Sequence, residues 1–269
     1  MIGFIGGGNM AEAMIKGILS SEFGTRSEMK NILVSEPREE RRVYLEKTYN
    51  IKTTHDNKEV IKNCNIIILA VKPQNMDEVA AEISDLISKE HLIVSIAAGI
   101  TLSYLTSRLK TKKIIRVMPN TPALVQEGMS VLSMCECIHD KEMGIVRDIF
   151  MSIGKVMVLP EKYMDAVTAL SGSGPAFFAL FVEHMIDAGV EMGLSREIAT
   201  ELAIQTFTGT AKLLESGISP DKLRVMVTSP GGTTSAGLNV FEERGLKNSV
   251  MDALVAARKR SEEIGQKKI

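Results

Sequence analysis

The sequence predicts an α/β protein of two domains, covering residues 1–160 and residues 161–269. In the first domain, short apolar runs rich in β-branched residues alternate with segments of helical apolar spacing. Continuous apolar strands separated by helices are typical of a parallel sheet that is covered on both faces. After Pro160 the chain offers helical runs almost exclusively, so we expect the second domain to be all-helical.

The expected elements follow from these runs in chain order. We expect strands at Ile2–Ile5, Ile32–Val34, Ile66–Val71, Leu92–Ile96 and Ile114–Met118, with Ser130–Met134 and Val156–Val158 extending the sheet. Helical spacing predicts helices at Asn9–Leu19, Arg38–Thr48, Asn75–Ser88, Leu102–Leu109 and around Lys141–Ser152. The second domain is expected to contain helices at Tyr163–Leu170, Pro175–Met192, Arg196–Ser216, Pro220–Val227, Thr234–Arg244 and Leu246–Ile264.

Composition excludes several classes of protein. The 269-residue chain has a formal net charge of −1, so there is no global attraction to nucleic acid or to an anionic membrane. The apolar runs Ile66–Val71 and Leu92–Ile96 are too short to span a bilayer. No signal segment precedes the first expected strand at Ile2, which favours a cytoplasmic location. The segment Ala176–Met192 is apolar around much of its circumference, as in a helix buried between others or against a second subunit.

No metal site is expected. The three cysteines, Cys64, Cys135 and Cys137, form neither an even disulfide set nor a full ligand pattern, and we expect reduced thiols. The four histidines stand far apart, and none belongs to a metal motif.

A glycine-rich segment follows the first strand directly. Gly6, Gly7, Gly8, Asn9, Met10 and Ala11 match G-x-G-x-x-G/A and open a helix. In this fingerprint the first glycine permits a tight turn, the second lets the backbone approach a diphosphate, and the last small residue keeps the helix near the sheet. With a strand before it and a helix after it, the segment predicts a Rossmann-type dinucleotide-binding domain.

The end of the second strand bears on the choice between NAD and NADP. Glu36 would accept hydrogen bonds from free ribose hydroxyls, whereas Ser35 with Arg38 suits a 2′-phosphate. The sequence supplies both arrangements. A purely structural interpretation makes Ser35 a helix cap, Pro37 a first-turn residue and Glu36, Glu39 and Glu40 favourable to the helix dipole, and it excludes neither cofactor.

The third apolar strand ends in Ala70, Val71, Lys72 and Pro73. Ligands of open α/β sheets lie beyond the carboxyl ends of the strands, so this loop should border the reactive half of the cofactor. Lys72 is open to three interpretations: a proton donor, a phosphate contact or a solvated lysine.

A second glycine-rich loop, Ser229–Leu238, lies between two helical segments. Its tandem glycines allow close approach to the backbone, and its threonines stand where a helix begins. Such a terminus can receive an anion, although a tight capped turn between helices would explain the same residues.

Several motifs together resemble the pyrroline-5-carboxylate reductase family. They are FIGGGNMAEAMIKG, LAVKP, SIAAGI, RVMPNTPALVQEGM, LSGSGPAFF and SPGGTTSAGL, and the resemblance extends over essentially the whole chain. It implies NAD(P)H-dependent reduction of 1-pyrroline-5-carboxylate to L-proline, the last step of proline biosynthesis. It also implies that the helical domain joins two subunits, giving a homodimer or a higher homo-oligomer such as a decamer.

The resemblance also implies site residues. Cofactor contacts carry over to Gly6 through Ala11, Glu36, Asn57, Val71, Lys72 and Ala98, and product contacts carry over to Thr233, Thr234 and Glu161. With Ser229, Gly231 and Gly232 the two threonines form the implied carboxylate receptor, and Thr234 is expected to present its hydroxyl to the ring nitrogen. Many members have a small hydroxyl residue where Glu36 stands, so this position departs from the family pattern. NADP is the expected cofactor, with NADH as the alternative.

Two other functions fit the same sequence. One is another imine or 2-hydroxyacid reductase on the same architecture, which would turn over a 2-oxoacid instead. The other is a dinucleotide-sensing protein without turnover, although sensing does not need the second anion receptor at Ser229–Leu238.

Overall fold

The computed structural model describes residues 1–21, 31–135 and 137–266. It divides into two compact units, Met1–Ser173 with Ala257–Ile269, and Gly174–Ala256. The boundary between the two units, at Ser173 and Gly174, lies beyond the boundary expected after Pro160. The helical segment that follows Pro160 is bonded to the sheet, and the end of the last helix is bonded to that segment, where Ser261 Oγ donates to Asp165 Oδ1 at 2.6 Å.

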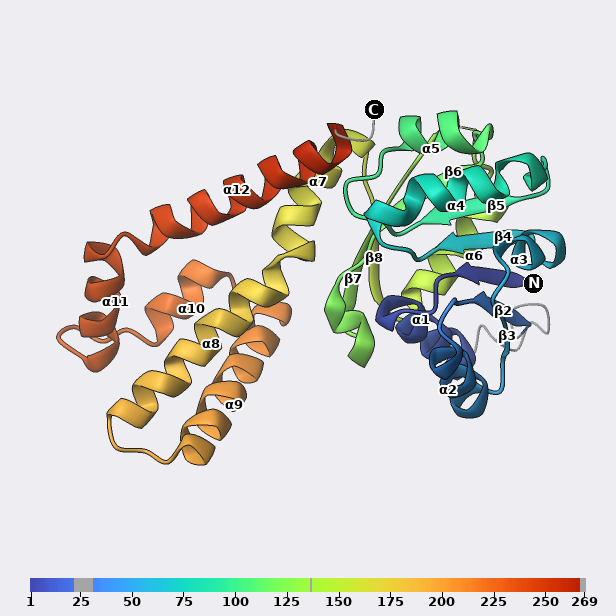
Figure 1. Ribbon diagram of the computed structural model, residues 1–269. Helices are drawn as coiled ribbons and strands as arrows, with labels where there is room; N and C mark the ends of the chain where they lie inside the picture. The colour runs from blue at the N-terminus through green and yellow to red at the C-terminus, as the bar shows by residue number, and fades with distance from the viewer. Residues whose placement is uncertain (22–30, 136, 267–269) are drawn as a thin grey trace. The chain divides into compact units, whose positions relative to one another are not determined.

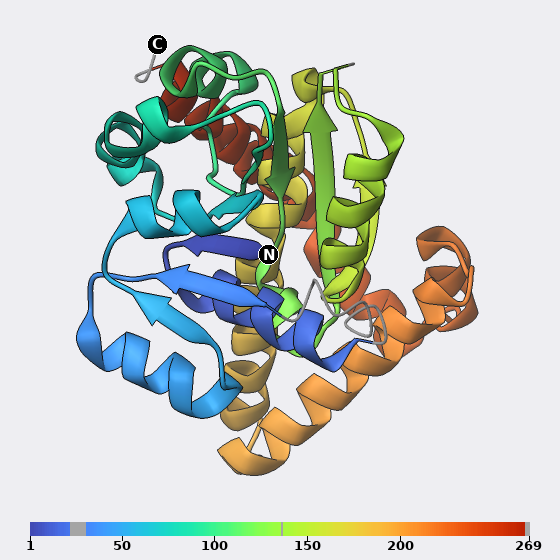
Figure 2. The ribbon, with the colours of Figure 1, turned by 90° about the vertical axis from the view of Figure 1, so that its right-hand side faces the viewer.

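The first unit contains an eight-stranded sheet in the order β3-β2-β1-β4-β5-β6-β7-β8. Strands β1 to β6 are mutually parallel. The chain adds β2 and β3 on one side of β1 and then returns to add β4, β5 and β6 on the other side, as in doubly wound folds. Strand β7 runs antiparallel to β6, and Figure 2 shows their green arrows pointing in opposite directions. The strands are β1 Ile2–Ile5, β2 Ile32–Ser35, β3 Lys52–Thr54, β4 Ile66–Leu69, β5 Leu92–Ser95, β6 Ile114–Met118, β7 Gly128–Met134 and β8 Gly154–Val158.

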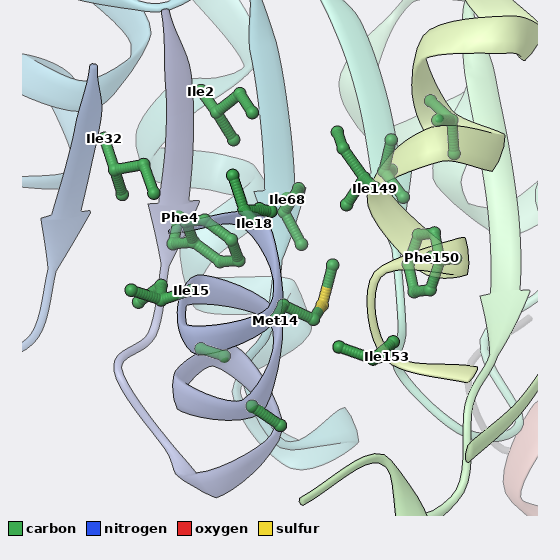
Figure 3. Packing of buried hydrophobic residues seen from close by; sticks show 14 of the residues in the cluster. Ile2, Phe4, Met14, Ile15, Ile18, Ile32, Ile68, Ile149, Phe150 and Ile153 are labelled. Atoms are coloured by element: carbon green, nitrogen blue, oxygen red, sulfur yellow. The ribbon is translucent and has the colours of Figure 1, made fainter. Parts of the chain in front are cut away.

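Helices cover both faces of this sheet. One core lies under α1 (Asn9–Ser20), α2 (Glu39–Tyr49) and α6 (Asp140–Met151), and the other lies under α3 (Asn57–Asn63), α4 (Met76–Ile83) and α5 (Leu102–Leu109). Figure 3 shows part of the first core, in which Phe4 of β1 faces Ile15 and Ile18 of α1. The expected Rossmann-type architecture is confirmed.

The differences from the expected elements lie mostly at polar segments. Strand β3 and helix α3 were not expected, because Lys52–Thr54 is short and polar and Asn57–Asn63 is only seven residues long. Where a single helix was expected over Asn75–Ser88, the structure has the shorter helix α4 with a 3₁₀ turn before it, at Pro73–Asn75, and another after it, at Ser84–Leu86.

The cysteine expectation is wrong for one pair. Cys135 and Cys137, just beyond the end of β7, are joined in a disulfide, whereas Cys64 is free and buried. The Ile138 N–H donates to the Cys135 carbonyl oxygen at 3.3 Å, so the chain turns back at this pair. Burial raises the pKa of the Cys64 thiol to about 11, so it stays protonated at neutral pH.

The second unit is helical and buries little of its own apolar surface. It contains α8 (Gly174–Glu191), α9 (Arg196–Glu215), α10 (Pro220–Met226), α11 (Thr233–Glu243) and most of α12 (Leu246–Gln266). Helices α8 and α9 lie side by side (Figure 1), with Gly189 closely approached by Ala199. Exposed large side chains include Phe178, Leu202, Met226 and Val255, so much of this unit's apolar surface lacks cover within the chain.

Candidate dinucleotide and substrate sites

The two outer glycines of the fingerprint are needed for different physical reasons. Gly6 has φ +99°, and a Cβ atom there would lie 2.7 Å from the Ala70 carbonyl oxygen. Gly8 has φ −70°, and a Cβ atom there would meet nothing within 4 Å. Gly6 is therefore required by the turn itself, whereas Gly8 leaves open space directly above the backbone.

That open space lies at the N-terminus of α1. Gly8 is the N-cap residue and contributes no side-chain bond, and the first intrahelical bond runs from Glu12 N to Gly8 O at 2.9 Å. The amide groups of Asn9, Met10 and Ala11 therefore have no acceptor within the helix. Because these amides and the helix dipole favour an anion, the loop can receive a diphosphate.

A cleft of about 530 Å³ lies at this edge of the sheet. It brings together residues of four expected segments: Gly6, Gly8, Ser35, Glu36, Arg38, Asn57, Ala70, Val71 and Lys72. The other lining residues were not expected as cofactor contacts: Ile5, Pro37, His55, Asn75, Glu78, Val79 and Glu82. The expected contacts Gly7, Asn9, Met10, Ala11, Pro73 and Ala98 are not part of the lining; Gly7 and Ala11 are buried in the described fold.

Glu36 and Arg38 form an ion pair at the position expected to meet the adenosine ribose. Glu36 Oε1 accepts bonds from Arg38 Nε at 2.7 Å and from Arg38 N at 3.2 Å, and Glu36 Oε2 accepts from Gly7 N at 3.0 Å. Burial favours the neutral acid, but these hydrogen bonds outweigh it and hold the pKa of Glu36 below its ordinary value. The carboxylate is therefore charged, and the Glu36 side chain is only 6% exposed, whereas the Arg38 side chain is 68% exposed.

Ser35 does not cap the following helix, so that part of the structural interpretation is wrong. The N-cap of α2 is Arg38, and Ser35 instead lies in the cleft, where its Oγ donates to Asn57 Oδ1 at 2.6 Å. Asn57 Nδ2 in turn donates to Glu82 Oε2 at 2.7 Å. This chain of bonds fixes the orientation of the Asn57 amide beside the ribose position.

The second glycine-rich loop leads into α11. Gly231 has φ +69°, and Gly232 is the N-cap, with its N–H bonded to Ser229 O at 3.0 Å. Helix α11 begins at Thr233, so the amides of Thr233 and Thr234 lie in its first turn. Because the cap is a glycine without a side chain, this N-terminus can bind a small carboxylate through its backbone.

Glu161 lies in the first unit, in a 3₁₀ turn after β8. Its Oε1 accepts from Arg116 Nη1 at 2.9 Å and from Leu102 N at 2.7 Å. The Arg116 side chain is 4% exposed, so Glu161 neutralises a buried cation. A product contact by Glu161 stays a prediction beside this structural role.

The motif Ser171–Pro175 has a packing role in the first unit. Asn120 Nδ2 donates to Ser171 O and Ser171 Oγ, both at 3.2 Å, and Asn120 Oδ1 accepts from Met129 N at 2.8 Å. A Cβ atom on Gly172 would overlap the Met118 side chain. The absence of a side chain at Gly172 thus permits close packing against Met118.

No group of three or more His, Cys, Asp or Glu side chains that could hold a metal ion occurs within the described ranges. A doubly wound sheet with an uncapped helix N-terminus after β1 and a buried acidic residue after β2 is typical of dinucleotide-dependent oxidoreductases.

Comparison with known proteins identifies the family. Residues 161–264 match the family model for pyrroline-5-carboxylate reductase dimerisation, and residues 1–99 match the model for the coenzyme F420-dependent NADP oxidoreductase domain. The chain is 41% identical over 267 residues to a pyrroline-5-carboxylate reductase from Synechocystis, covering 99% of this chain and 98% of the relative. The chain belongs to the pyrroline-5-carboxylate reductase family.

Solved structures of pyrroline-5-carboxylate reductases are similar to this chain over nearly its whole length. A pyrroline-5-carboxylate reductase from Coxiella burnetii has a TM-score of 0.88 at 34% identity and covers 98% of this chain and 97% of its own. The Plasmodium falciparum pyrroline carboxylate reductase with NADP bound has a TM-score of 0.87 at 34% identity, with the same coverage. The predicted fold, the family, and an NAD(P)H-dependent oxidoreductase acting on pyrroline-5-carboxylate are confirmed.

Proposed function

We propose that this chain reduces 1-pyrroline-5-carboxylate with its cofactor diphosphate on the Gly6–Ala11 loop and its substrate carboxylate on the Gly232–Thr234 turn. The observation that carries the first half is the open space at Gly8, above a helix terminus whose amides have no acceptor in the helix. The second half rests on the matching uncapped terminus of α11. The donors of both proposed anion sites are backbone amides, which the helix already holds in place, so no long side chain has to become ordered when the anion binds.

The cofactor we propose is NADPH, with NADH as a second reductant. The NADP oxidoreductase model over residues 1–99 and the NADP bound in the Plasmodium relative support it. Arg38 is exposed enough to turn from Glu36 toward a 2′-phosphate, and Lys72 lines the same cleft. Glu36 opposes this preference, because its buried charge lies where a 2′-phosphate would enter.

The proposed reaction needs little proton transfer from the protein. A bound reduced dinucleotide would supply the hydride for the C=N carbon of the substrate, whose protonated nitrogen would take up the π electrons. The residues of the α11 terminus therefore have to orient the ring rather than deliver a strong acid. We propose that Thr234 presents its hydroxyl to the ring nitrogen and that the amides of Gly232, Thr233 and Thr234 hold the carboxylate, with Ser229 and Gly231 shaping the turn.

Replacing Thr234 with Ala tests this assignment. The kcat/KM for pyrroline-5-carboxylate should fall by roughly 10- to 100-fold, about 1.4 to 2.8 kcal/mol of transition-state stabilisation. Thr210→Ala is a matched control, because Thr210 Oγ1 is exposed and donates to the Thr206 carbonyl oxygen within its own helix, α9, at 2.8 Å. An unchanged kcat/KM in Thr234→Ala, or proline bound in a crystal away from Thr234, would remove this residue from the mechanism.

We also propose that the chain works as a homodimer or a higher homo-oligomer such as a decamer, in the cytoplasm and without nucleic acid or membrane partners. The match of residues 161–264 to a dimerisation domain supports a second copy as the cover for the exposed apolar side chains of α8 and α9. The helical stretch Glu161–Glu191 is also long and apolar enough to cross a membrane, and 11% of its apolar window is buried. A subunit interface on this stretch accounts for the same exposure. Light scattering on detergent-free protein should give an even number of subunits, whereas a monomer would contradict the proposal.

A further inference from the structure

Gly7, the second residue of the fingerprint, has both its backbone N–H and its carbonyl oxygen bonded to side chains. Its N–H donates to Glu36 Oε2 at 3.0 Å, and its carbonyl oxygen accepts from Arg41 Nε at 2.7 Å. Both partners come from the segment after β2, more than twenty residues away along the chain. Since a peptide unit is planar, fixing the Gly7 carbonyl also fixes the direction of the Gly8 amide that follows.

Arg41 makes a second bond with the same guanidinium group. Its Nη2 lies 2.5 Å from Glu12 Oε2, and both side chains are 18% exposed. Glu12 Oε1 accepts from the hydroxyls of Tyr44 and Tyr49, both at 2.8 Å. Both oxygens of the carboxylate are thus bonded, and Arg41 is the cation paired with it in the described structure.

The charge of Glu12 matters because of its place in α1. It is the fourth residue of the helix and lies in the same first turn as the amides expected to hold the diphosphate. An acidic residue in the first turn stabilises the helix dipole, but the same charge repels an anionic ligand at that terminus. Burial raises the pKa of Glu12, yet the bonds from Tyr44, Tyr49 and Arg41 lower it overall, so the group is charged at neutral pH.

We propose that Arg41 is a positioning residue for the cofactor: it fixes the Gly7 carbonyl and masks the charge of Glu12 from the diphosphate. Arg41 is not part of the cleft lining, so it acts through Gly7 and Glu12 rather than by touching the ligand. The fork of a guanidinium suits this task, because it donates to a carbonyl and a carboxylate at once, which a lysine ammonium does less well. The inference rests on the proposed contact between the diphosphate and the Gly6–Ala11 loop.

The test uses the full-length protein with three variants, Arg41→Met, Arg41→Met with Glu12→Gln, and Arg147→Met. Arg147 is an exposed arginine on α6 and serves as the matched control. Arg41→Met should raise the Kd of NADPH, measured by calorimetry, and the KM for NADPH by about 10-fold, with kcat within about twofold of wild type. Adding Glu12→Gln should recover part of that loss, because the unmasked charge is then gone. Arg147→Met should leave both constants unchanged.

Two results would overturn the inference. One is a wild-type Kd in Arg41→Met. The other is a raised Kd that Glu12→Gln does not improve and that comes with an equal loss of kcat, because general loosening of the fold would do that. Wild-type protein is measured first: if it fails to bind NADPH, the proposed cofactor site is wrong, whereas normal binding by both wild type and Arg41→Met rejects the role of Arg41 alone.

Discussion

Replacing Gly8 with Ala should separate cofactor binding from folding. Gly8 has φ −70°, which an L-residue adopts freely, and its added Cβ atom would meet nothing within 4 Å. Alanine is a poorer N-cap than glycine by up to about 1 kcal/mol, but it also lowers the entropy of the unfolded chain, worth about 0.4–1 kcal/mol. The two effects offset each other, so the free energy of unfolding should change by less than about 1 kcal/mol.

The same methyl group should weaken cofactor binding strongly. It occupies the space through which a diphosphate would reach the amides of the α1 terminus. A hydrogen bond to a charged group contributes about 1.5–3 kcal/mol, so losing one of them corresponds to a rise in the Kd of NADPH of roughly 10- to 100-fold.

Gly6→Ala is the contrasting variant. Its φ of +99° and the 2.7 Å approach to the Ala70 carbonyl make an added Cβ atom costly in the fold itself, by at least about 1–2 kcal/mol. Thermal unfolding without ligand should therefore show a lower Tm for Gly6→Ala and a nearly unchanged Tm for Gly8→Ala. Calorimetric titration with NADPH should show the loss of affinity in Gly8→Ala. Wild-type affinity in Gly8→Ala, or a loss of Tm as large as that of Gly6→Ala, would refute the reasoning.

Three further predictions follow from the ion pairs of the first unit. Glu161→Ala leaves Arg116 buried without its carboxylate, so urea unfolding should show a loss of about 2–4 kcal/mol, and a loss below about 1 kcal/mol would contradict the pairing. Glu36→Ser should raise the ratio of kcat/KM for NADPH over that for NADH, and an unchanged ratio would dismiss Glu36 as a determinant. Glu12 and Glu36 have folded pKa values below their ordinary 4.5, so they stabilise the fold above that pH, and this stability is lost as the pH falls through their folded pKa values. The free energy of unfolding should therefore depend less on pH, between about pH 6 and 3, in the double variant Glu12→Gln with Glu36→Gln than in the wild type. The same pH dependence in both proteins would contradict both pKa shifts.

The apolar strands could be predicted because burial on both faces leaves a continuous run of residues in the sequence. Ile114–Met118 was expected with the bounds that the structure gives, and the helix Leu102–Leu109 likewise. Strand β3, Lys52–Thr54, could not be predicted, since an edge strand of three polar residues has no apolar period. The antiparallel direction of β7 was equally hidden, because alternation along a strand is the same in both directions.

The candidate site was predictable where the backbone demands a residue type. Gly6 is such a position, since its positive φ excludes most other residues. The bond from Arg41 to the Gly7 carbonyl was not predictable, because an arginine on a charged helix looks like any solvated residue until the fold brings two segments together. Glu36 and Arg38 were expected as alternatives, and the structure pairs them with each other.

The most direct measurement of the central claim is the initial rate of NADPH and NADH oxidation with pyrroline-5-carboxylate, with the product identified by chromatography. We expect stoichiometric formation of L-proline, and a lower rate in Gly8→Ala through a raised KM for the dinucleotide. Turnover of a 2-oxoacid without turnover of pyrroline-5-carboxylate, or tight cofactor binding without turnover of any cyclic imine, would contradict it.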